Sequence, residues 1–145
     1  MRICFFILLS SLLFSCKNDA SGDGGSEKPL SDSLLQLVLD GHDVAMPKMM
    51  KLSRLQKEAQ AEMDSLKGLP GAAHTARIAA LDSTIKKLSF ADVSMNEWME
   101  GFRYDSLKND ETARVAYLKM QLESVNQMKD IVLATIEEAD SVLAK

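Results

Sequence analysis

The sequence predicts an all-α protein, an antiparallel bundle of three long helices. From Leu30 to Leu143, apolar residues recur every three or four positions, which is the spacing of a helix face. Gly68–Pro70 and the polar stretch before Asp110 divide this region into three segments of similar length. No segment alternates apolar and polar residues over a strand's length, so a β-sheet is not expected.

The first helix is expected to run from Leu30 to the stop at Gly68–Pro70, with Ser31 as its N-cap. Pro47 lies inside this helix. Proline has no N–H to donate, and its ring crowds the carbonyl four residues earlier. The helix should therefore be kinked near Pro47.

The second helix is expected from about Ala72 to Phe102. Its apolar positions alternate steps of three and four residues, as in a heptad repeat. They are Ile78, Leu81, Ile85, Leu88, Met95, Met99 and Phe102, with Asp92 as the one polar member. Because the repeat continues in phase across Asp92, one helix is favoured. If Asp92 instead capped a new helix, the fold would be a four-helix bundle.

The third helix should begin at Asn109 or Asp110, since either residue can cap a helix. Its apolar positions are Val115, Leu118, Leu122, Val125, Val132, Ile136, Ala139 and Leu143, with Lys129 as the polar exception. Short turns between three such helices give an up-down-up bundle. A turn at Leu69–Pro70 would place His42 level with Glu97.

The N-terminus resembles a bacterial lipoprotein signal. Arg2 precedes an apolar run, Ile3 to Phe14, which ends in a small residue, Ser15, directly before Cys16. About twelve apolar residues are too few to span a bilayer. The expected organisation is therefore a signal peptide at 1–15, a lipidated Cys16 with a flexible tether at 16–29, and a helical bundle domain at 30–145.

The tether and its lipid predict a cell-envelope location. Lys17–Lys28 contains no apolar residue larger than alanine, so a flexible segment spanning roughly 20 Å on average is expected. Lys17-Asn18-Asp19 partly matches the signal that sends some Bacteroidetes lipoproteins to the cell surface. The outer membrane is the expected location, and the periplasmic and surface faces both stay open.

Composition argues against nucleic-acid binding and against catalysis. After loss of Arg2, 16 Lys and Arg stand against 21 Asp and Glu, a net charge of −5; nucleic-acid binding instead favours a basic face. The two histidines, His42 and His74, are expected far apart along the bundle. No free cysteine remains after lipidation and no Gly-x-Ser-x-Gly motif occurs, so an enzyme is not expected.

Methionines concentrate at one predicted end of the bundle, near the only histidine there. Thioether sulfurs and an imidazole form a soft ligand set that favours Cu(I). The candidate ligands are His42, Met46, Met49, Met95 and Met99. The alternative is a methionine-rich core, because methionine is flexible and fills irregular space beside a kink.

A charged pair is expected near the Pro47 kink. Lys48 and Asp92 fall at nearly the same predicted level, so a partly buried ion pair could set the register of the bundle. The alternative is that the kink exposes both groups to water.

The segment His42-Asp43-Val44-Ala45-Met46-Pro47-Lys48-Met49, with Trp98-Met99 later, resembles a family of small uncharacterised Bacteroidetes lipoproteins. Its members often carry the label "viral A-type inclusion protein". The resemblance implies an envelope location and a helical fold, and it implies no activity.

These observations together predict a lipid-anchored envelope protein with a structural or protein-interaction role. Its expected contacts are the membrane, through the lipid on Cys16, and an unidentified envelope protein. The alternative function is Cu(I) binding by the cluster of methionines and His42. Self-association is a further expectation, because Leu39, Leu133 and Val142 lie off the main apolar faces.

Overall fold

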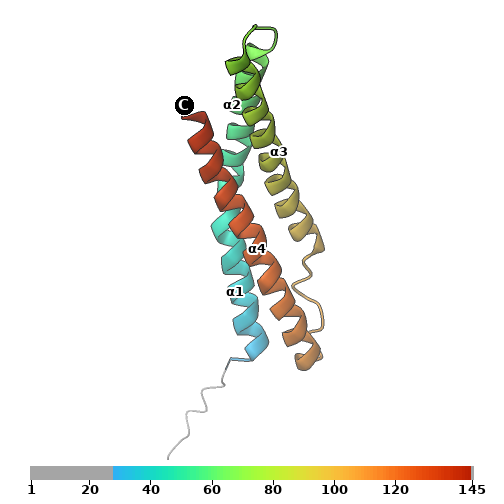
Figure 1. Ribbon diagram of the computed structural model, residues 1–145. Helices are drawn as coiled ribbons and strands as arrows, with labels where there is room; N and C mark the ends of the chain where they lie inside the picture. Colours follow the sequence, from blue (N-terminus) through green and yellow to red (C-terminus); the bar gives the residue numbers. More distant parts are fainter. Residues whose placement is uncertain (1–27, 145) are drawn as a thin grey trace, which may run out of the picture.

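The computed structural model describes residues 28–144 as a bundle of helices (Figure 1). The elements are α1 (Leu30–Ala45), the short 3-10 helix η1 (Met46–Lys48), α2 (Met49–Leu66), α3 (Ala72–Gly101) and α4 (Glu111–Leu143). This part of the chain contains no strand. The predicted signal peptide, Cys16 and residues 17–27 lie outside the described residues. The all-α prediction is confirmed.

Pro47 interrupts the first predicted helix without ending it. It lies in η1, and the residues on either side, Ala45 and Met49, keep right-handed helical backbone angles. The 3-10 turn accommodates the missing N–H of the proline, so α1 and α2 continue as one kinked rod. A 3-10 turn therefore interrupts the α-helix at the position where the sequence predicts a kink, and the bundle has three rods.

The three rods run up, down and up (Figure 1). The rod of α1 and α2 contacts α4 along α1 and α3 along α2, while α3 also packs on α4. Because α3 is continuous over 30 residues, Asp92 does not cap a new helix and the four-helix alternative is wrong. No helix within residues 28–144 has the length and apolarity needed to cross a membrane.

The turn between α2 and α3 brings residues of the two rods side by side as the sequence predicts. His42 stacks on Trp98, one residue from the predicted neighbour Glu97. At the other end of the same two rods, the Arg77 guanidinium donates a hydrogen bond to the Glu62 carboxylate. The α3–α4 connection is different, because residues 102–110 run on past the end of α3 before α4 begins (Figure 1).

The core consists of two apolar clusters between the rods, a larger one and a smaller one around Ala59, Met63 and Leu81. The largest fully buried apolar side chains are Val38, Leu52, Leu55, Leu81, Leu88, Met95, Leu118, Val125 and Val132. Gly41 brings α1 close to α4, since a Cβ on Gly41 would lie 3.0 Å from Cγ1 of Val125. A side chain larger than alanine at this position would push the two helices apart.

Helix caps follow the sequence at α4 but not at α1. The carboxylate of Asp110 accepts a hydrogen bond from the N–H of Ala113 at 3.0 Å, as predicted. Ser31 is not the N-cap of α1, because the helix starts at Leu30 and its N-cap is Pro29, two residues before Ser31. Ser31 is instead buried, and its hydroxyl donates to Glu111 of α4 at 2.7 Å. This contact joins the first turns of α1 and α4.

Candidate functional site

A row of four aromatic rings joins the three rods where α3 ends. His42 of α1 stacks on Trp98 of α3 with ring centroids 5.6 Å apart. Trp98 stacks on Phe102 at 4.9 Å, and Phe102 lies parallel to Tyr117 of α4 at 6.4 Å. The backbone N–H of Arg103 donates to the Tyr117 hydroxyl at 2.7 Å, which holds the last ring in place. We call these four residues the aromatic row.

A groove opens beside the aromatic row, between α3 and α4. It measures about 350 Å³ and is lined by Phe90, Ser94, Glu97 and Trp98 of α3 and by Ser124, Gln127, Met128 and Ile131 of α4. Phe90 lies at its edge with 60% of its surface exposed. We call this the α3–α4 groove.

The Trp98 indole forms the inner wall of the α3–α4 groove. The side chain is buried, and its Nε1–H has no hydrogen-bond partner among the described residues. The site therefore combines apolar side chains from both helices with hydroxyl and amide groups and with the carboxylate of Glu97.

The predicted Cu(I) ligands are brought together only in part. Met95 is fully buried in the core, and Met49 and Met99 pack against the same cluster. His42 touches this region through its stack on Trp98, whereas Met46 on η1 is 44% exposed. Within residues 28–144, no group of three or more His, Cys, Asp or Glu could hold a metal ion. The burial of Met95 favours the core-packing alternative, and Cu(I) binding stays a prediction.

The predicted Lys48–Asp92 pair does not form among the described residues. Lys48 is exposed on η1, and the Asp92 carboxylate accepts a hydrogen bond from the side-chain amide of Asn96 at 3.2 Å. The buried position on this part of α3 belongs to Ala91. Since successive helical residues are rotated by about 100°, Asp92 is turned away from the core centre.

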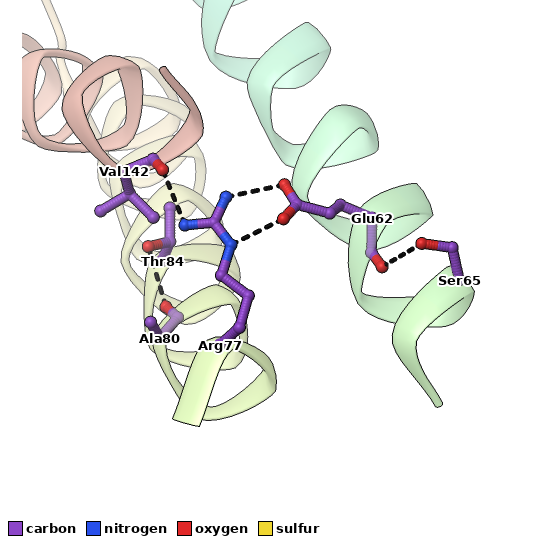
Figure 2. Close-up of polar contacts among 6 residues, drawn as sticks. All are labelled: Glu62, Ser65, Arg77, Ala80, Thr84 and Val142. Atoms are coloured by element: carbon purple, nitrogen blue, oxygen red, sulfur yellow. Dashed lines mark hydrogen bonds and ion pairs between the residues drawn. The ribbon is translucent and has the colours of Figure 1, made fainter. Parts of the chain in front are cut away.

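A polar contact that the sequence analysis missed ties three helices together at the other end of the bundle (Figure 2). The Arg77 guanidinium of α3 donates to both carboxylate oxygens of Glu62 on α2, at 2.6 and 2.8 Å. It also donates to the carbonyl of Val142 on α4 at 2.8 Å. The turn at Leu69–Pro70, read from the sequence, already places residues 62 and 77 opposite each other. The pairing of an acid with an arginine at these two positions could therefore have been predicted.

Loss of the Arg77 contact should destabilise the bundle more at neutral pH than in acid. Hydrogen bonds from Arg77 hold the pKa of Glu62 below its ordinary value. The resulting stabilisation is complete above the ordinary carboxyl pKa and is lost as the pH falls through the lower, folded-state pKa. Because both side chains are partly exposed, Arg77→Leu is expected to cost about 1 kcal/mol at pH 7 and less at pH 3.

Urea unfolding of the wild type and of Arg77→Leu at both pH values measures this difference. Arg54→Leu is the matched control, because Arg54 pairs with Glu58 within α2 alone. The control should change stability little at either pH. An Arg77→Leu effect that stayed equal at pH 3 would show that the Glu62 pair does not contribute.

The fold and this site define an all-α three-rod bundle protein with an open groove beside an aromatic row. No protein-family model, no curated protein and no solved structure matches the chain.

Proposed function

We propose that this chain is a lipid-anchored cell-envelope protein that binds a partner protein and performs no catalysis. The lipid on Cys16 holds it to the membrane, with the outer membrane as the proposed location, and the bundle presents a binding surface. The observation that carries the binding role is the α3–α4 groove with its exposed Phe90.

The composition of the α3–α4 groove fits a protein partner. Interfaces combine an apolar centre, enriched in aromatic residues and methionine, with a polar edge that stays accessible to solvent. Phe90, Met128 and Ile131 supply apolar surface, while Ser94 and Gln127 offer hydrogen bonds. An aromatic side chain that is mostly exposed on a bundle with an otherwise well-packed core is a candidate anchor for a partner.

A photo-activated cross-linking residue at position 90 tests the binding role in living cells. We expect one discrete cross-linked protein, and we expect its yield to fall when Gln127→Glu places a charge at an exposed position of the α3–α4 groove. The matched control carries the cross-linker at Ala79, which is exposed on α3 but does not line the groove. A similar set of products from both positions would contradict partner binding at the groove.

Removal of the lipidation site should release the protein from the membrane. The Cys16→Ser chain is expected to leave the membrane fraction, because a lipoprotein signal needs the cysteine thiol to accept lipid, and stable anchoring takes more than one acyl chain. Fractionation of cells, with metabolic labelling by palmitate, measures this outcome. Ser15→Ala, which keeps a small residue before Cys16, is the control and should stay with the membrane. Membrane retention of Cys16→Ser would rule out the lipid anchor.

A further inference from the structure

The chain enters the bundle at the end that carries the α3–α4 connection. Pro29 and Ser31 line one small hollow together with Lys108 and Glu111. The backbone N–H and the hydroxyl of Ser31 both donate to the Glu111 carboxylate, at 3.1 and 2.7 Å. The start of α1 and residues 102–110 therefore lie at the same end, opposite the α2–α3 turn (Figure 1).

This end exposes apolar side chains that the core does not use. Leu30 is 56% exposed, Tyr104 is 59% exposed and Leu107 is 47% exposed. Leu107 also has a φ of 59°, a left-handed conformation that a leucine rarely adopts. We call the surface of Leu30, Tyr104 and Leu107 the entry face.

The charged groups around the entry face are of both signs. Asp105 pairs with Lys108, Asp110 caps α4 and Glu111 binds Ser31, while Asp32 is exposed beside them. The Lys108 ammonium lies 5.4 Å from the Tyr104 ring centroid. Tyrosine with lysine or arginine is the combination that favours the membrane–water boundary, since each has an apolar body and a polar tip.

We propose that the entry face docks on the lipid surface that holds Cys16, so that the bundle stands end-on at the membrane. This inference rests on the proposed lipid anchor. Residues 17–28 would hold the start of α1 within roughly 20 Å of the anchor on average. The α2–α3 turn lies farther away by the length of α3, which is about 45 Å for 30 residues. Of the two ends of the bundle, the end that carries the entry face is therefore the one that stays beside the bilayer.

Depth-dependent quenching tests this orientation on the full lipidated chain. Cys4 leaves with the signal and the Cys16 thiol carries lipid, so an introduced cysteine is the one free thiol for a fluorescent probe. One chain carries Asn109→Cys, beside the entry face, and the control carries Ala73→Cys at the other end; both positions are exposed. The chains are reconstituted in phosphatidylcholine vesicles that contain a spin-labelled lipid.

We expect the probe at residue 109 to lose emission and the probe at residue 73 to keep it. Tyr104→Gln with Leu107→Asn should restore emission at residue 109, because it removes the apolar contact while asparagine tolerates the left-handed backbone of residue 107. Circular dichroism confirms that the variant stays helical.

The remaining outcomes separate the two proposals. A chain that floats with the vesicles but shows no quenching at residue 109 overturns docking and leaves the lipid anchor intact. Equal quenching at residues 73 and 109 shows a bundle lying flat and overturns end-on docking. Quenching that persists in the double variant overturns the role of the entry face. A chain that does not float with the vesicles overturns the anchor and the docking together.

Discussion

Trp98→Ala is expected to lower the free energy of unfolding by about 3–5 kcal/mol, the range for removal of a large buried aromatic side chain. Trp98 is 8% exposed and belongs to the main core cluster. It also stacks on His42 of α1 and on Phe102 at the end of α3. The substitution would therefore leave a cavity and break the aromatic row at its centre.

Urea unfolding followed by far-UV circular dichroism measures this loss without relying on tryptophan fluorescence. Trp98→Phe is the matched control, because it keeps an aromatic ring and removes an N–H that has no partner among residues 28–144. The control should cost clearly less than the alanine variant. A Trp98→Ala cost below about 0.5 kcal/mol, the level of an ordinary surface substitution, would show that the aromatic row does not hold the rods together.

Gly41→Leu is expected to lower the free energy of unfolding by roughly 3 kcal/mol, at the upper end of the range for overpacked cores. Gly41 is buried against α4, where a Cβ alone would meet Val125 at 3.0 and 3.4 Å. Three further carbon atoms would force α1 away from α4. Helix propensity favours leucine over glycine by less than about 1 kcal/mol, which does not offset this crowding.

Thermal and urea unfolding of three chains separates crowding from propensity. Gly41→Ala is the control and should change stability little, because its gain in helix propensity offsets a mild contact with Val125. Val125→Ala in the Gly41→Leu background should recover part of the loss, since it frees space at the contact. If Gly41→Leu is as stable as the wild type, the close approach of α1 and α4 is not required.

Local rules predicted much of the fold from particular residues. The three-four spacing of apolar residues identified the helices, and Pro47 predicted the kink because it has no N–H to donate. Asp110, one of the two predicted candidates, caps α4. The short α2–α3 turn also fixed the level of these helices, so His42 could be placed beside the end of α3 before any contact was known.

The candidate site was predicted less well. The level of His42 and Trp98 followed from the turn, but the α3–α4 groove did not, because it depends on the path of residues 102–110 past the end of α3. The Lys48–Asp92 pair is not formed within residues 28–144 for a related reason, and the alternative that Lys48 is exposed to water agrees with its position on η1. On α3, Leu81, Leu88 and Met95 are buried as predicted, but the second buried column is Thr84, Ala91 and Trp98 and not Ile85, Asp92 and Met99.

The sequence by itself determined that three helical rods form and where Pro47 interrupts the first of them. It also determined which row of apolar residues on each rod faces the core. Only the tertiary structure decided which flank of α3 faces α4. Lys87 pairs with Glu138 at 2.6 Å, and Ser94 and Trp98 share the groove with α4, so this flank includes residues 84, 91 and 98. A periodic pattern marks the inward side of a helix equally well for either handedness of a three-rod bundle. The handedness, and with it the burial of Ala91 in place of Asp92, follows from how the rods pack.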